Sequence, residues 1–190
     1  MIIAVCGLAG AGKTTSLDIL ERLGMGAKVY VGAFVTAEVS RRGMEPTPQS
    51  EREVREDLRN TRGMAALAEL AMPTIQGILG AGRVALVDAI YCAEEFEFYR
   101  DRCNVQVVRI AIVTVRHERV RRLAARSIRP LDAEALDRRD DFELTRLGLE
   151  GVIRAAEYKL DNDGSLDNLE STLARMIIPL GGDTIPSLSS

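Results

Sequence analysis

The stretch "GLAGAGKTT", residues 7–15, decides the fold, because it joins the short apolar run "IIAVC" to an amphipathic segment. Gly7, Gly12, Lys13 and Thr14 satisfy the pattern G-x-x-x-x-G-K-[ST], the Walker A motif or P-loop. The glycines of such a loop let backbone N–H groups turn inward around an anion, and the helix that follows adds the positive end of its dipole. The sequence therefore predicts a strand, a phosphate-binding loop and a helix, in that order.

Two side chains of this loop have expected partners on a nucleotide. Lys13 is expected to reach the β- and γ-phosphates, and the Thr14 hydroxyl is expected to ligate Mg²⁺. A chance glycine-rich turn is the alternative, but the strand before the loop and the helix after it both favour the phosphate-binding interpretation.

The composition indicates one soluble globular domain. The chain has 190 residues, of which 46% are hydrophobic and 28% charged, and this is ordinary globular usage. Its net charge of −3 argues against nucleic-acid binding, which needs a large positive surface. No segment approaches the roughly 20 apolar residues of a membrane span, and the opening residues lack the charged start of a signal peptide. We expect a cytoplasmic protein, a monomer or a homodimer, that binds neither nucleic acid nor a membrane.

Cysteine and histidine are too few to suggest other chemistries. Cys6, Cys92 and Cys103 form an odd set without C-x-x-C spacing, so the sequence supports neither a disulfide framework nor a zinc site. His117 is the single histidine, which argues against a catalytic triad.

Short apolar runs alternate with longer amphipathic ones, the pattern of a parallel sheet wrapped by helices. Strands are predicted at 2–6, 28–31, 83–87, 106–113 and 158–161. Helices are predicted at 13–23, 35–42, 50–59, 64–79, 93–102, 116–126, 133–156 and 165–178. Pro73 is expected to kink or split the fourth helix, because it lacks an N–H and its ring crowds the preceding turn. Residues 181–190 are expected to form a flexible tail.

The stretch "RSIRPLDAEALDRRDD", residues 126–141, interrupts the apolar pattern with charge and a proline. It predicts a mobile surface segment over the carboxyl edge of the sheet. Arg126 and Arg129 flank its start, and guanidinium groups on a closing segment can stabilise a transferring phosphoryl group.

Two further features have both a functional and a structural interpretation. Asp88 ends the strand "VALVD" at the edge where parallel sheets bind ligands, so it could serve Mg²⁺ or the acceptor, or merely cap a turn. A row of arginines recurs at helical spacing and could either grip an acceptor or form a solvated stripe paired with nearby glutamates. This row consists of Arg52, Arg55, Arg59 and Arg62.

Six segments together resemble those of a known family: "MIIAVCGLAGAGKTT", "RRGMEPTP", "VALVDAI", "RRLAAR", "RRDDFEL" and "AAEYKLDNDGSLDNL". The chain resembles the nucleoside-monophosphate-kinase-like P-loop kinases, most closely the uncharacterised, largely archaeal branch related to adenylate kinase and dephospho-CoA kinase. This resemblance implies an α/β fold in three layers, with a five-stranded parallel sheet in the order 2-3-1-4-5. It also implies one domain over 1–180, an acceptor-binding insert at about 33–80 and an arginine-bearing lid at about 126–140.

The resemblance also implies roles for individual residues. Arg126 would be the lid arginine, Arg139 and Asp140 a lid-closing pair that reaches the γ-phosphate, and Asn162 a neighbour of the donor adenine. Catalytic roles fall to Lys13, Asp88, Arg126 and Arg139. The donor phosphates would be bound by Gly7, Leu8, Ala9, Gly10, Ala11, Gly12, Lys13, Thr14 and Thr15.

The departures from the family pattern fall on the acceptor side. Phe34 and Ala37 stand where relatives carry an Asp and an Arg after the second strand, and Ala89 and Tyr91 stand where a Gly and an Arg are expected. The donor half of the site is therefore complete, whereas the acceptor half is rewritten. As a replacement, Arg55 and Arg59 could form a clamp, while Phe34 and Tyr91 could stack on a flat group.

The sequence thus predicts an ATP-dependent phosphotransferase that uses Mg²⁺ and acts on a small nucleotide-like or other phosphorylatable acceptor. The alternative is a nucleotide-binding regulatory protein, or a slow NTPase, that has lost the usual acceptor site. A regulatory GTPase is less favoured, because the chain has no N-K-x-D sequence for reading guanine.

Overall fold

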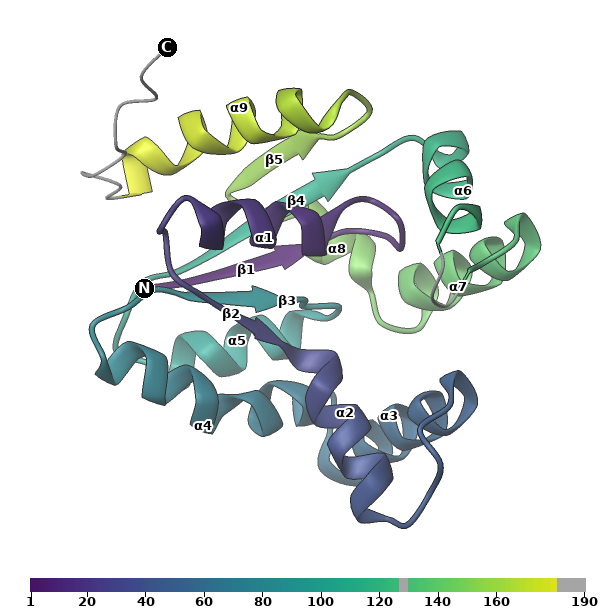
Figure 1. Ribbon diagram of the computed structural model, residues 1–190. Coiled ribbons are helices and arrows are strands. Elements are labelled where there is room, and N and C mark those ends of the chain that lie inside the picture. The colour runs from purple at the N-terminus through teal and green to yellow at the C-terminus, as the bar shows by residue number, and fades with distance from the viewer. Residues whose placement is uncertain (127–129, 181–190) are drawn as a thin grey trace.

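Five parallel strands form the centre of the protein, in a computed structural model that describes residues 1–126 and 130–180. The strands are β1 (Ile2–Cys6), β2 (Ala27–Tyr30), β3 (Ala85–Asp88), β4 (Val107–Val113) and β5 (Tyr158–Asp161). Their order in the sheet is β2-β3-β1-β4-β5, and every neighbouring pair is parallel (Figure 1). The predicted α/β fold and its strand order are confirmed.

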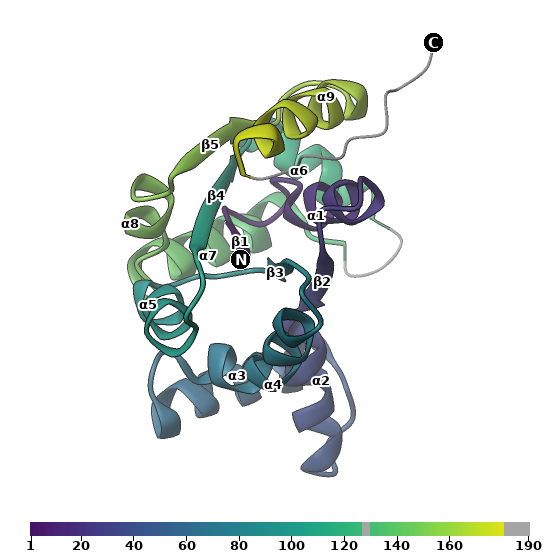
Figure 2. The ribbon, with the colours of Figure 1, turned by 90° about the vertical axis from the view of Figure 1, so that its left-hand side faces the viewer.

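Helices cover both faces of this sheet and its carboxyl edge (Figures 1 and 2). One face carries α1 (Lys13–Arg22) and α9 (Leu166–Ile177), and the other carries α4 (Ala66–Gly80), α5 (Ala93–Arg102) and α8 (Leu149–Arg154). Beyond the carboxyl ends of the strands lie α2 (Val31–Arg41) with α3 (Pro48–Arg62), and α6 (Arg116–Ala124) with α7 (Ala133–Thr145). A short 3₁₀ helix, Ile178–Leu180, follows α9.

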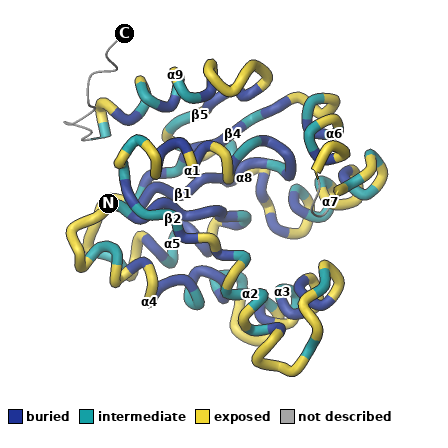
Figure 3. Tube along the Cα trace, in the orientation of Figure 1, coloured by how far each residue is buried: buried dark blue, intermediate teal, exposed yellow. Residues whose placement is uncertain are grey.

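Both faces of the sheet are buried, as Figure 3 shows for its central strands. Successive side chains of a strand point to opposite faces, so β1 contributes to two cores. Ile2, Ala4 and Cys6 pack with α4, α5 and α8, while Ile3 and Val5 pack with α1 and α9. A strand that is buried on both faces reads as a continuous apolar run, which is why "IIAVC" could be recognised in the sequence.

Two helix predictions were wrong. The helix predicted over 133–156 is divided into α7 and α8, because Gly148 adopts a left-handed φ of 69° between them. The predicted break at Pro73 does not occur, since α4 runs through it. Ala71, Met72 and Ile75 are buried around the exposed Pro73 ring, so core packing holds the helix despite the missing N–H. The predicted tail, 181–190, lies outside the described residues.

In the described ranges, no helix is long and apolar enough to cross a membrane.

Replacing Pro73 by Ala should stabilise the protein. Alanine restores an N–H to the interior of α4 and removes the crowding of the preceding turn, and we expect a gain of about 1–3 kcal/mol in the free energy of unfolding. Urea unfolding measures it. Thr74→Ala, at the exposed neighbouring position, is the control and should change stability by less than about 0.7 kcal/mol. A loss of stability in Pro73→Ala would show that the ring itself contributes to packing.

Candidate active site

The P-loop follows β1 and turns at the carboxyl end of that strand. Gly7, Gly10 and Gly12 have φ values of 139°, 81° and 101°, which only glycine adopts readily. A Cβ atom on Gly7 would lie 2.2 Å from the carbonyl oxygen of Ile112, so the loop can pass this close to β4 only without a side chain. Lys13 begins α1, which places the N-terminus of that helix at the loop as predicted.

The loop is held in place through its own carbonyl groups. Asn162 Nδ2 and the Thr114 hydroxyl both donate to the carbonyl oxygen of Ala11, at 2.8 and 3.1 Å. Arg119 Nη1 donates to the carbonyl oxygen of Ala9 at 3.2 Å. All three side chains are buried. Thr114 and Asn162 follow β4 and β5, so two strand ends and α6 together fix the shape of the loop.

The structure shows a role for Asn162 in supporting the loop, and its predicted position beside the donor adenine stays a prediction. Its amide nitrogen is bonded to Ala11 beneath the loop. The anchoring residues Thr114 and Arg119 were missed by sequence reasoning. Their partners in the loop lie 103 and 110 residues away in the sequence. A polar residue next to an apolar segment was therefore the only sequence signal that could have pointed to them.

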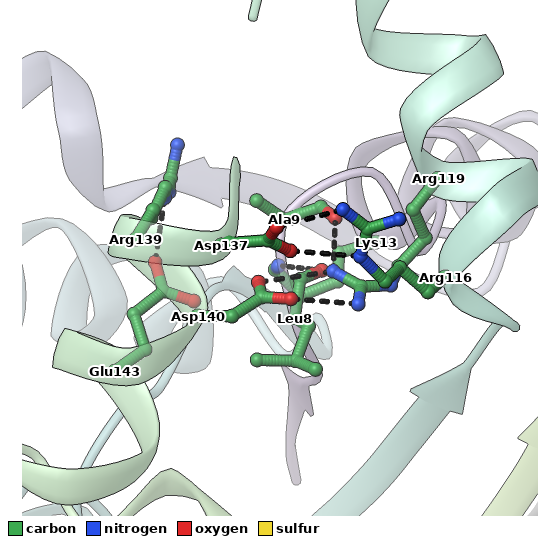
Figure 4. Close-up of polar contacts among 9 residues, drawn as sticks. All are labelled: Leu8, Ala9, Lys13, Arg116, Arg119, Asp137, Arg139, Asp140 and Glu143. Atoms are coloured by element: carbon green, nitrogen blue, oxygen red, sulfur yellow. Dashed lines mark hydrogen bonds and ion pairs between the residues drawn. The ribbon is translucent and has the colours of Figure 1, made fainter. Parts of the chain in front are cut away.

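The Lys13 ammonium lies inside the loop, as Figure 4 shows. Nζ donates to the carbonyl oxygens of Gly7 at 2.6 Å and of Leu8 at 3.0 Å, and it lies 5.6 Å from the centre of the Tyr91 ring. Burial lowers the pKa of Lys13, and the nearby Glu143 carboxylate opposes that shift. A cation held on neutral carbonyl groups is well placed to gain from an incoming anion.

Thr14 and Asp88 meet beside the loop. The Thr14 hydroxyl donates to Asp88 Oδ2 at 2.7 Å, and β3, which Asp88 ends, is the neighbour of β1 in the sheet. Hydroxyl and carboxylate oxygens are ligands that suit Mg²⁺. No cluster of three or more acidic, histidine or cysteine side chains that could hold a metal occurs in the described residues.

Helix α7 is tied to α6 and to the loop. Asp140 accepts two hydrogen bonds from Arg119, at 3.0 and 2.7 Å, and Asp137 accepts two from the exposed Arg116, both at 2.7 Å (Figure 4). Asp140 of the predicted lid-closing pair thus bonds to Arg119, and the role of the pair toward the γ-phosphate stays a prediction. The bidentate geometry of Arg119 fixes where α7 lies relative to the loop.

Arg139 lies one turn before Glu143 on α7 and is bonded to it. Its Nε donates to Glu143 Oε1 at 2.7 Å. Although burial opposes the charge, neighbouring Tyr91 and Glu143 raise the pKa of Arg139. Arg126 is exposed just beyond α6, and its predicted lid role stays a prediction, while Arg129 lies outside the described residues.

The predicted acceptor residues fall into two groups. Arg59 is buried and pairs with Glu95 at 3.3 Å, and Glu95 Oε2 also accepts from the backbone N–H of Tyr91 at 2.7 Å. Burial raises the pKa of Glu95 despite the nearby Arg59 guanidinium. Arg59 is therefore part of the support beneath the segment after β3, and its acceptor-binding role stays a prediction.

The other three acceptor candidates remain near the site or the adjoining core. Arg55 lies 3.8 Å from Glu51 with about a third of its side chain exposed (35%), and burial lowers the pKa of its guanidinium. Tyr91 lies beside Lys13, and burial raises the pKa of its phenol to about 12. Phe34 packs against the core in a half-buried position.

The chain is similar to known proteins along most of its length. A family model described as "AAA domain" matches residues 3–141, more than half of the chain. A UPF0200 protein of Aeropyrum pernix is 34% identical over 187 residues, covering 96% of each chain. A UPF0200 protein of Thermococcus kodakarensis is 31% identical over 180 residues, covering 93% of this chain and 96% of that protein.

Solved kinases share the fold. Shikimate kinase from Bacteroides thetaiotaomicron superposes with a TM-score of 0.60 at 17% identity, covering 95% of this chain and 98% of that one. A gluconokinase from Sinorhizobium meliloti gives a TM-score of 0.54 at 15% identity, covering 94% of each. The resemblance to P-loop kinases inferred from the sequence is confirmed. The chain belongs to the AAA-domain family of P-loop proteins, together with these archaeal UPF0200 proteins.

Proposed function

We propose that this protein transfers the γ-phosphoryl group of ATP to a small-molecule acceptor. The observation that supports this most is the convergence of Lys13 with the Thr14–Asp88 pair at the carboxyl edge of β1 and β3. Phosphoryl transfer passes through a loose transition state, so positioned cations and a metal supply most of the rate. A site of this kind needs a cation and ligands for a metal, and Lys13, Thr14 and Asp88 can supply them.

Lys13 would exchange partners when the nucleotide binds. Its bonds to the carbonyls of Gly7 and Leu8 are replaced by bonds to β- and γ-phosphate oxygens, which carry full negative charge. Because the ammonium is already buried, little further desolvation is required. Lys13 would therefore exchange hydrogen bonds to neutral carbonyl groups for stronger, charge-assisted hydrogen bonds to phosphate.

Thr14 and Asp88 are the residues that would hold Mg²⁺. The metal would supply positive charge that offsets the charge developing on the leaving group. Asp88 and the Thr14 hydroxyl already lie 2.7 Å apart, so both oxygens can turn to one ion with small movements.

Arg139 and Arg126 are the cations proposed for the lid. Arg139 is held by Glu143 and influenced by Tyr91, close to Lys13, whereas Arg126 lies exposed at the start of the segment that joins α6 to α7. A lid of this kind would stabilise the transferring group and keep water from the reaction. Kinase names among the proteins of the same fold agree with this proposal.

The burial of Arg59 against Glu95 favours the second candidate, a regulatory nucleotide-binding protein or slow NTPase. One of the two arginines proposed to replace the usual acceptor clamp is not free to bind a ligand. An added acceptor should stimulate ADP release by a kinase, but not by a regulatory nucleotide-binding protein or a slow NTPase.

Lys13→Ala should reduce ADP release from ATP·Mg²⁺ by about 100-fold or more, because a buried cation aimed at the transferring phosphoryl group is lost. Coupled-enzyme assays measure the rate, alone and with nucleoside monophosphates, nucleosides and dephospho-CoA as acceptors. Lys159→Ala, at an exposed position on β5, is the matched control and should behave as wild type.

Thermal unfolding with ATP·Mg²⁺ and with GTP·Mg²⁺ separates binding from turnover, since a ligand that binds only the folded state raises Tm. A rise in Tm without acceptor-stimulated ADP release would support the regulatory candidate. No rise with either nucleotide would contradict the proposed function.

Arg59→Ala and Arg55→Ala should have different effects. Arg59→Ala leaves Glu95 buried without its charge partner, and we expect it to cost about 3–5 kcal/mol of stability. Arg55→Ala removes a side chain that is about a third exposed (35%) and lies 3.8 Å from the Glu51 carboxylate. Because Glu51 also accepts a hydrogen bond from the Thr36 hydroxyl, it should cost less stability than Arg59→Ala. Urea unfolding measures both. Equal losses would show that Arg55 supports the fold as much as Arg59 does.

A further inference from the structure

The Glu143 carboxylate has one oxygen in use and one without a partner. Oε1 accepts from Arg139 Nε at 2.7 Å. Oε2 is buried and has no hydrogen-bond partner among the residues that the structure describes, and only 5% of the side chain is exposed. Buried carboxylate oxygens are almost always paired, because an unpaired one loses its water and gains nothing in return. An unpaired oxygen of this kind can accept a hydrogen bond from a donor group on a ligand.

This carboxylate lies at the P-loop. Glu143 follows Asp140 by three residues on α7, and Arg119 bonds to both Asp140 and the loop carbonyl of Ala9. In agreement with that position, the Glu143 charge raises the pKa of Tyr91 and opposes the lowering of the pKa of Lys13 by burial. Figure 4 shows Oε2 turned away from Arg139, while Oε1 is held by it. Arg139 thus fixes the carboxylate and leaves the second oxygen available.

The other acidic side chains around the site already have donors. Asp88 accepts from Thr14, and Asp140 accepts from both terminal nitrogens of Arg119. Glu95 accepts from Arg59 with one oxygen and from the backbone of Tyr91 with the other. Among the described residues, Glu143 Oε2 is the carboxylate oxygen that is itself buried without a hydrogen-bond partner, so a donor can bind to it without breaking an existing hydrogen bond.

We propose that Glu143 Oε2 accepts a hydrogen bond from the hydroxyl group that this protein phosphorylates, so that the acceptor reacts as an alcohol rather than as a phosphate monoester. This inference rests on the proposed phosphotransferase function. An open carboxylate oxygen attracts an O–H donor and repels a phosphate dianion. Ala37 and Tyr91, where relatives carry arginines for an acceptor phosphate, agree with that choice.

The reaction balances with Glu143 as the proton acceptor. The acceptor oxygen forms a bond to the γ-phosphorus, and the bond from that phosphorus to the bridging oxygen breaks, with the electron pair leaving on ADP. The hydroxyl proton passes to Glu143 Oε2 and then to solvent. Arg139 keeps the carboxylate in position through Oε1.

Water is the simplest hydroxyl acceptor, so slow ATP hydrolysis tests this role before the natural acceptor is identified. Glu143→Gln keeps an oxygen for Arg139 but cannot take a proton, and kcat for ADP release should fall by about 100-fold. The KM values for ATP and for Mg²⁺ should stay unchanged. Glu134→Gln is the matched control, because Glu134 forms an i,i+4 pair with Arg138 on the same helix but is exposed, and it should retain the wild-type kcat.

Glu143→Asp guards against a loss of folding, since it keeps a carboxylate in a shorter side chain. It should give a rate between those of wild type and Glu143→Gln, with a Tm close to that of wild type. A wild-type kcat in Glu143→Gln, or an increased requirement for Mg²⁺, would overturn the inference while leaving the phosphotransferase function intact. Absence of ADP release from the wild-type protein with every acceptor, water included, would instead overturn the proposed function itself.

The bond formed in the product tests the acceptor class. Phosphorus-31 NMR distinguishes a phosphate ester, made on a hydroxyl group, from a phosphoanhydride, made on a phosphate group. We expect an ester from any acceptor in the panel that stimulates ADP release. A phosphoanhydride product would overturn the inference, because the attacking oxygen would then carry no proton for Glu143 to accept.

Discussion

The site depends on the hydrogen bonds that Asn162 and Thr114 make to the carbonyl oxygen of Ala11. These two donors follow β5 and β4, so the P-loop is anchored to the ends of two strands beside its own. Without such anchors a glycine-rich segment would adopt many conformations, and ordering it at the moment of binding would cost entropy. With them, Lys13 and Thr14 are already positioned when a nucleotide arrives.

Buried side chains also anchor the helices beyond the sheet. Arg119 contacts the loop at Ala9 and holds α7 through Asp140, so one buried guanidinium connects the P-loop to the helix that carries Arg139 and Glu143. Removing one member of a buried ion pair leaves the other charge uncompensated, which makes such a pair a strong determinant of geometry. On the opposite side, Arg59 and Glu95 hold the segment after β3 in the same manner. Two ion pairs thus position the residues that would face the transferred group from either side.

Much of the fold could be predicted because its signals are local. The strand–loop–helix unit at the P-loop, the bounds of β1, β5 and α5, and the parallel arrangement all follow from apolar runs and glycine spacing. The errors arose where tertiary packing outweighs a local rule. Core contacts of Ala71, Met72 and Ile75 keep α4 intact through Pro73, and Gly148 ends one helix and begins another inside a segment whose apolar pattern continues.

The sequence by itself determined the class of fold and the strand–loop–helix unit at the Walker A motif, because each depends on residues close together in the chain. Only the tertiary structure decided which charged side chains support the fold and which remain available to a ligand. Arg55 and Arg59 share one helical row, yet Arg59 is buried on Glu95 while Arg55 remains partly exposed. Glu143 lies in the segment "RRDDFEL", but its position there indicated no role, and only the structure shows that one of its oxygens is buried without a partner. The reason is that pairing and burial of charges depend on contacts between residues far apart in the sequence, which spacing along one helix does not encode.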